Sequence, residues 1–118
     1  MKVRLSKEYS FDSAHKLPWH KGKCQYLHGH TYKLRVTVEG KLNQNGIIID
    51  FGDLKAIVNK HVVDVLDHKF LNDIFVNPTA EMMAKGIFNT IKKYLPEGVK
   101  LCMVELWETP TSKAIVIP

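Results

Sequence analysis

The stretch Leu34-Arg35-Val36-Thr37-Val38 alternates strictly between apolar and polar residues. Because successive side chains of a strand point to opposite faces, this alternation predicts a strand with one buried face. Residues 3–11 alternate more loosely and predict an earlier strand of the same kind. Residues 16–26 lie between the two and contain Pro18 and Gly22, which indicates a loop. Two strands joined by a loop therefore open the chain.

A first helix is predicted over residues 51–66. The preceding residues 40–46 hold two glycines and two asparagines, a composition typical of a turn. Asp50 stands directly before the helical pattern, where its carboxylate can cap free backbone N–H groups. Apolar residues then recur at the spacing of one helix face, namely Leu54, Ile57, Val58, Val62 and Val65.

A second helix is predicted to begin at Asn77 and Pro78, because proline favours the first position of a helix. Apolar residues line one face of it, and Pro96 and Gly98 end the pattern.

Residues 99–107 and 114–117 are again strand-like, so the predicted order is strand, strand, helix, helix, strand, strand. A four-stranded antiparallel sheet with two helices packed on one face satisfies this order, which makes the fold class α+β. The 118 residues contain no repeat or linker, and their composition of 45% hydrophobic and 25% charged residues is ordinary for a globular protein. We therefore expect a single domain over residues 1–118.

The distribution of apolar residues and the low cysteine content favour a cytoplasmic location of the protein. No stretch approaches the roughly 20 apolar residues of a membrane span, and the first fifteen residues carry charges without the apolar run of a signal peptide. Cys24 and Cys102 are too few for a disulfide framework. We therefore expect a cytoplasmic protein with no membrane partner.

The formal net charge of +5 attracts anionic partners, but charge alone does not separate a nucleic acid from a small phosphorylated substrate. A solvated basic surface explains the same charge without any partner. The one local concentration of lysines, Lys16, Lys21 and Lys23, surrounds histidines and a cysteine. This placement favours a small-molecule site over a nucleic-acid surface.

The segment His28-Gly29-His30 enters the second strand, where residues two apart project from the same face. His15 follows the first strand and reaches the same point if the two strands pair. Three imidazoles with a fourth position left open are a common arrangement for a catalytic zinc ion. The alternative is that these histidines are ordinary surface or hydrogen-bonded residues.

Cys24 lies four residues before His28 and has two interpretations. It is either the fourth ligand of a closed structural zinc site or an unligated thiolate that acts as a base or nucleophile. Cys102 stands in an apolar strand, where packing explains it.

Three further residues are candidates, two for proton transfer and one for ligand binding. Asp67 next to His68 can orient an imidazole for proton transfer, although a histidine at a helix C-terminus is also favoured for structural reasons. Glu108 can accept two hydrogen bonds from a planar N–C–N edge of a heterocycle, or it can be an exposed charge at a strand end.

Several separated blocks stand out along the chain, namely Phe11-Asp12-Ser13-Ala14-His15, Cys24 with His28-Gly29-His30, Gly46 through Asp50-Phe51, Leu66-Asp67-His68 with Leu71-Asn72, Pro78-Thr79-Ala80-Glu81, and Glu108-Thr109. Together these blocks resemble the family of 6-pyruvoyltetrahydropterin and 6-carboxytetrahydropterin synthases. The similarity runs along nearly the whole chain, and glutamate does not replace the cysteine as it does in the folate branch of the family. Three residues separate Cys24 from His28, a spacing similar to that of the carboxytetrahydropterin branch of queuosine biosynthesis.

The resemblance implies the tunnelling fold (T-fold), in which subunits close into barrels, typically as a homohexamer. It implies one Zn²⁺ per subunit and conversion of 7,8-dihydroneopterin triphosphate to 6-carboxy-5,6,7,8-tetrahydropterin, with release of acetaldehyde and triphosphate. The alternatives are a 6-pyruvoyltetrahydropterin synthase and, more distantly, a non-catalytic zinc module that binds nucleic acid. The implied residues are His15, His28 and His30 for zinc, Cys24, Asp67, His68 and Glu108 for catalysis, and Thr79, Glu81 and Glu108 for the substrate.

Overall fold

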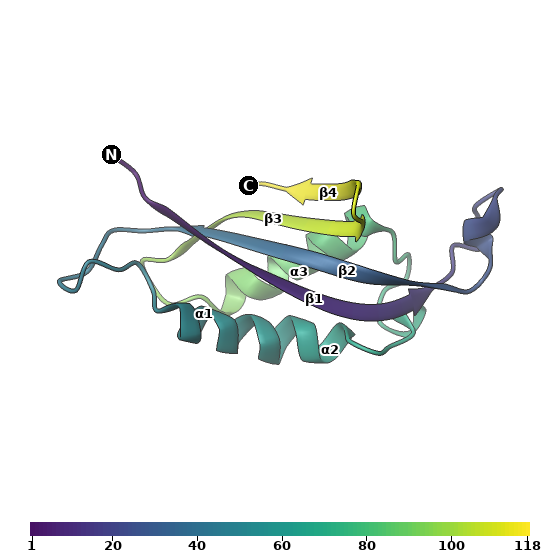
Figure 1. Ribbon diagram of the computed structural model, residues 1–118, viewed down its shortest axis with the longest axis horizontal. Coiled ribbons are helices and arrows are strands. Elements are labelled where there is room, and N and C mark those ends of the chain that lie inside the picture. The colour runs from purple at the N-terminus through teal and green to yellow at the C-terminus, as the bar shows by residue number, and fades with distance from the viewer.

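The computed structural model describes residues 1–118 and contains one four-stranded antiparallel sheet in the order β1-β2-β3-β4 (Figure 1). The strands are β1 (Arg4–His15), β2 (His28–Glu39), β3 (Lys100–Thr109) and β4 (Ser112–Val116). This confirms the predicted α+β class and strand order. The first two strands extend beyond the predicted ranges because they pair over their full length, from Arg4 with Glu39 to His15 with His28.

Two helical segments lie on the same face of the sheet (Figure 1). The first runs without a break through α1 (Phe51–Val58), a π-helical turn (Asn59–Val63) and α2 (Asp64–Leu66). Its bounds match the predicted helix over residues 51–66, and the Asp50 carboxylate accepts a hydrogen bond from the Gly52 N–H at 2.7 Å. Short 3₁₀ turns occur at Lys23–Gln25 and Leu71–Asp73.

The second helix begins later than predicted. α3 spans Ala80–Tyr94, and Pro78 lies outside it. The Thr79 hydroxyl accepts a hydrogen bond from the Met82 N–H at 3.1 Å, so threonine, and not the preceding proline, defines the start. A side-chain oxygen satisfies a free N–H group of the first turn, which a proline ring cannot do.

The core lies between the sheet and the helices. Leu34, Val36 and Val38 are fully buried on the helix-covered face, as their alternation predicts. Leu54, Met83 and Ile91 of the helices belong to the same cluster, with their side chains 0% exposed. None of the helices combines the length and apolar character needed to cross a membrane.

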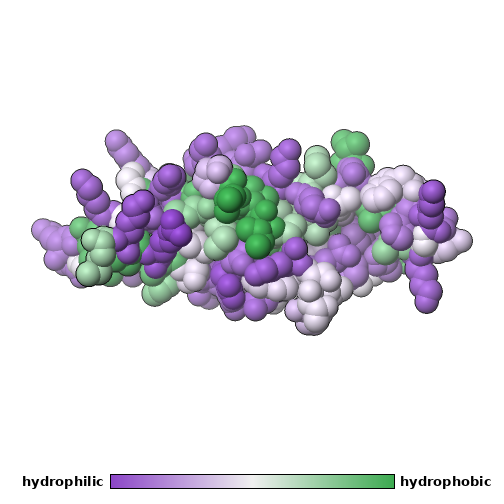
Figure 2. All heavy atoms as spheres, turned by 90° about the horizontal axis from the view of Figure 1, so that it is seen from above, coloured by the Kyte–Doolittle hydropathy of each residue, from purple (hydrophilic) through white to green (hydrophobic).

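The opposite face of the sheet has no helix over it (Figure 1). It carries a charged network in which the buried Glu105 pairs with Arg35 and Lys113. β4 forms one edge of the sheet, and its Ile115 is exposed, as is Ile117 directly after the strand. Figure 2, seen from the side on which β4 lies, shows an apolar area in the middle of hydrophilic atoms.

Candidate active site

Three imidazoles converge at the end of the β1–β2 pair. His15 pairs with His28 across the strands, and His30 lies two residues further along β2 on the same face. The ring centroids of the three are 4.6 to 5.2 Å apart, and one ligand nitrogen of each lies within 4.8 Å of the others. The pairing of the strands thus brings together the predicted histidines.

Main-chain carbonyl groups orient two of these rings. His15 Nδ1 lies 2.8 Å from the Pro78 carbonyl oxygen, and His28 Nδ1 lies 2.7 Å from that of Tyr26. Each Nδ1–H donates to its carbonyl, which leaves Nε2 with a free lone pair. The two Nε2 atoms face each other at 3.0 Å. Such outer hydrogen bonds are usual for histidines that bind metals.

The third ring supports the same interpretation. His30 Nε2 is buried without a hydrogen-bond partner, although Glu108 Oε1 lies 3.3 Å away. Burial lowers the pKa of His30, the Glu108 carboxylate opposes this effect, and the neighbouring imidazoles lower the pKa further. A neutral ring with an unpartnered nitrogen suits a metal ion, so the donor set of three imidazoles fits zinc.

Cys24 lies outside this group. Its thiol is free and half-buried in the 3₁₀ turn Lys23–Gln25, and it is not among the ligand atoms that converge with the histidines. The backbone around it is fixed, because the Cys24 carbonyl accepts a hydrogen bond from the Leu17 N–H at 2.8 Å. The structure therefore does not form the closed zinc site in which Cys24 would be the fourth ligand beside the three histidines.

Asp67 and His68 contact each other but do not join the three histidines. The Asp67 carboxylate lies 3.0 Å from His68 Nδ1, and backbone N–H donation from Asp12, followed by the contact with His68, lowers the pKa of Asp67. His68 adopts a left-handed backbone conformation with φ of 54° and is 78% exposed in its side chain. These residues form a separate group with Asp12, whose side chain lies on the open face of the sheet.

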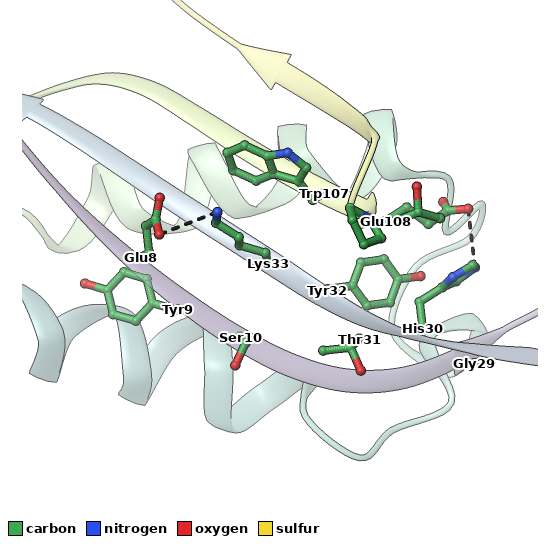
Figure 3. Close-up of a pocket in the computed structure, with 12 residues that line it drawn as sticks. Glu8, Tyr9, Ser10, Gly29, His30, Thr31, Tyr32, Lys33, Trp107 and Glu108 are labelled. Atoms are coloured by element: carbon green, nitrogen blue, oxygen red, sulfur yellow. Dashed lines mark ion pairs between the residues drawn. The ribbon is translucent and has the colours of Figure 1, made fainter.

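A pocket of about 770 Å³ adjoins the histidines where β3 ends (Figure 3). Its lining includes His30, Tyr32, Lys33, Trp107 and Glu108. Figure 3 shows the Glu108 carboxylate facing His30. The structure therefore places the predicted carboxylate at a cavity beside the histidine group.

Thr79 and Glu81 lie elsewhere. The Thr79 hydroxyl is engaged in capping α3, and Glu81 is exposed in the first turn of that helix. Neither lines the pocket of about 770 Å³. A capping hydroxyl and an acidic side chain in the first turn both stabilise a helix start, so these two residues can be explained without a bound ligand.

Tyr32 also lines the pocket, although no sequence motif pointed to it. This side chain is fully buried, its hydroxyl lies 3.4 Å from His15 Nδ1, and burial raises its pKa. The alternation along β2 is the signal that was available, since Tyr32 is two residues beyond His30 and shares its face.

Comparisons with known structures define the class of the protein. A solved 6-pyruvoyl tetrahydropterin synthase from Caenorhabditis elegans superposes with a TM-score of 0.89 and 25% identity, covering 100% of this chain and 96% of that one. The synthase from Plasmodium vivax superposes with a TM-score of 0.80 and 24% identity, covering 98% and 97%. The protein therefore has the T-fold of these enzymes.

Sequence comparisons assign the family. The pattern of the 6-pyruvoyl tetrahydropterin synthase family matches residues 4–117. The 6-carboxy-5,6,7,8-tetrahydropterin synthase of Haemophilus influenzae is 42% identical over 135 positions, covering 92% of this chain and 94% of the relative. The dihydroneopterin monophosphate aldolase of Pyrococcus furiosus is 44% identical over 108 positions, covering 92% and 91%. The chain belongs to the 6-pyruvoyl tetrahydropterin synthase family and is an enzyme of the lyase class.

Proposed function

We propose that the protein is a zinc-dependent 6-carboxy-5,6,7,8-tetrahydropterin synthase that acts on 7,8-dihydroneopterin triphosphate in queuosine biosynthesis in the cytoplasm. The observation that carries this proposal is the group of three imidazoles beside a pocket that contains Glu108. The spacing of Cys24 from His28 and the names of relatives from Haemophilus and Synechocystis support the same branch, the latter at 41% identity.

His15, His28 and His30 would hold one zinc ion per subunit. When bound, zinc supplies a Lewis acid that stabilises developing negative charge on substrate oxygens. The fixed orientation of the first two rings limits the loss of side-chain freedom on binding the ion.

The remaining steps belong to the protein's own side chains. Cys24, as a thiolate outside the ligand group, would remove a proton from the side chain of the substrate. His68, oriented by Asp67 at 3.0 Å, would transfer a proton on the opposite side. Glu108 would accept hydrogen bonds from the N–C–N edge of the pterin, and Thr79 and Glu81 remain proposed contacts. One water molecule balances the release of triphosphate and acetaldehyde.

His68 lies outside the cluster of three histidines, although it lines a pocket of about 600 Å³ together with His30. Within one chain the imidazoles of the three histidines face the helices, whereas His68 forms a group with Asp12 of the open face. In a homohexamer formed by pairing of the free sheet edges, a neighbouring subunit would bring its own His68 to the three histidines. The exposed Ile115 and Ile117 at the β4 edge fit such pairing, which would cover apolar surface.

Basic residues beside the site suit the triphosphate. Lys16, Lys21 and Lys23 are exposed on the loop that carries Cys24. Their charges attract an anionic substrate by long-range electrostatics.

A second candidate is an aldolase that acts on dihydroneopterin monophosphate. The relative of that name from Pyrococcus aligns over 108 positions, whereas the Haemophilus synthase needs 135 positions for the same 92% of this chain. The Haemophilus alignment therefore contains positions that this chain lacks. A retro-aldol cleavage of the side chain would give a hydroxymethyl dihydropterin and a phosphorylated two-carbon aldehyde, with no water consumed.

The decisive experiment incubates the zinc-loaded protein separately with the triphosphate and the monophosphate and identifies all products by mass. Acetaldehyde and a carboxytetrahydropterin from the triphosphate support the proposal. A phosphorylated two-carbon aldehyde from the monophosphate supports the aldolase instead. Loss of triphosphate without carbon–carbon cleavage identifies a 6-pyruvoyltetrahydropterin synthase.

Two variants test the residue roles. Cys24→Ala should lower turnover by about 10²–10⁴-fold, the usual contribution of a proton-transfer group, and leave zinc content near one per subunit. Cys102→Ala is the matched control and should keep full activity. His15→Ala should lower zinc occupancy, and loss of zinc from Cys24→Ala would support the closed structural site.

A further inference from the structure

The segment that carries His68 is fixed to the end of β1 by hydrogen bonds. The His68 N–H donates to the Asp12 carbonyl at 2.6 Å, and the Ala14 N–H donates to the Lys69 carbonyl at 3.0 Å. The Asp12 N–H donates to the Asp67 carboxylate at 2.9 Å. These contacts use main-chain atoms of β1, so they place the segment whatever side chain stands at position 12.

The Asp12 side chain adds a contact that depends on its chemistry. Its Oδ1 accepts a hydrogen bond from the Thr31 hydroxyl of β2 at 2.5 Å. Its carboxylate, the Asp67 carboxylate and a ring nitrogen of His68 all lie within 4.8 Å of one another. Of the two carboxylates, that of Asp67 forms the ion pair with the imidazole, whereas that of Asp12 lies beyond ion-pair distance but close enough for electrostatic attraction.

We propose that the Asp12 carboxylate, held by the Thr31 hydroxyl, is a positioning group for the His68 imidazole. This inference rests on the proposed function, in which His68 transfers a proton. The ring is 78% exposed and has little packing to fix its direction. Its backbone has a φ of 54°, a conformation that persists in residues other than glycine only where the surroundings hold it.

The contact with Thr31 fixes the direction of the exposed Asp12 carboxylate. Asp12 and Thr31 face each other in the β1–β2 register, and both are exposed. Without the hydroxyl donor the carboxylate can adopt other rotamers, and the ring then loses the electrostatic attraction of a carboxylate within 4.8 Å. Misplacement of a reacting group by even a small distance lowers the rate of the step it serves.

A double-mutant cycle tests the inference with zinc-loaded protein and the triphosphate substrate. Asp12→Ala should lower kcat about tenfold and change KM by less than twofold, because orientation and not binding is lost. In a His68→Ala background the same substitution should have no further effect, since the two groups act as a unit. Thr31→Val should lower kcat several-fold, and Thr31→Ser should restore it.

The controls separate positioning from stability. Asp64→Ala removes an exposed carboxylate on α2 and should leave kcat unchanged. Zinc content and oligomeric state should be the same in all variants. A decrease by the same factor with and without His68, or no decrease in Asp12→Ala and Thr31→Val, would overturn the inference.

A spectroscopic measurement distinguishes failure of the inference from failure of the proposed function. The imidazole resonances of His68, assigned by their loss in His68→Ala, should shift in Asp12→Ala and in Thr31→Val and stay unchanged in Asp64→Ala. This result does not require turnover, so it stands even if the protein acts on another pterin. Unchanged resonances in both variants would refute the positioning role, while lack of triphosphate turnover by the wild-type protein would refute the proposed function.

Discussion

Replacing Glu108 with glutamine separates two roles that this carboxylate can have. Its Oε1 lies 3.3 Å from His30 Nε2 without forming a hydrogen bond, and its side chain is 25% exposed at the pocket. If Glu108 anchors the ligand, Glu108→Gln removes charge-assisted hydrogen bonds to the N–C–N edge. If it instead orients His30, the same change weakens the hold on zinc.

The expected loss is large enough to measure. A hydrogen bond to a charged group contributes about 1.5–3 kcal/mol, which corresponds to a roughly ten- to hundredfold increase in Kd. Loss of a group that supports a metal ligand costs about 10–100-fold in metal affinity. Because the contact with His30 lacks hydrogen-bond geometry, we expect the effect on ligand binding and not on zinc.

Calorimetric titration with a phosphate-free dihydropterin measures the first effect, and elemental analysis after dialysis against a weak chelator measures the second. The probe lacks phosphates, so lysine contacts cannot compensate for the lost carboxylate. Glu97→Gln, an exposed carboxylate between α3 and β3, is the matched control. Unchanged dihydropterin affinity in Glu108→Gln, with or without loss of zinc, would refute the anchoring role.

Thr79→Ala should lower the free energy of unfolding by about 0.5–2 kcal/mol in urea denaturation through loss of the cap on α3, and Thr79→Ser should restore it. Weaker dihydropterin binding at unchanged stability would instead support a ligand contact. Leu34→Ala should cost about 2–5 kcal/mol in the same assay, because the side chain is fully buried, and a smaller loss would show that the core collapses around the gap. Burial lowers the pKa of His30, so the unfolded apoprotein binds more protons as the pH falls below about 6.5. The free energy of unfolding of the apoprotein should therefore decrease from that pH downward and be highest above it, and a pH-independent value between 5 and 7 would contradict this account.

The helices show where local signals are sufficient. Asp50 caps the first helix as predicted, because a cap depends only on a side chain and the N–H groups two or three residues later. The start of the second helix was misplaced for a related reason: proline and threonine both suit a helix start, and only the hydrogen bond to Met82 shows which one is used.

The site shows where local signals fail. His28 and His30 share a face by strand alternation, but the approach of His15 depends on the pairing of two strands separated by a loop. Asp67 and His68 are adjacent in the sequence, so their contact could be predicted. The position of the Asp12 carboxylate near them could not, because it depends on how the chain folds.

The sequence by itself predicted the four strands, the two helices apart from the start of the second, and the candidate histidine, cysteine and carboxylate residues, because periodicity and side-chain chemistry act over short distances, while the roles of these residues came from the family resemblance. The tertiary structure decided which nitrogens are free, which face of the sheet each group occupies, and that His68 clusters with Asp12 and Asp67 and not with the three histidines. The physical reason is that these properties arise from contacts between residues 13 to 63 positions apart, such as His15 with His28 and with the Pro78 carbonyl, and strand register fixes them only when the whole chain has folded.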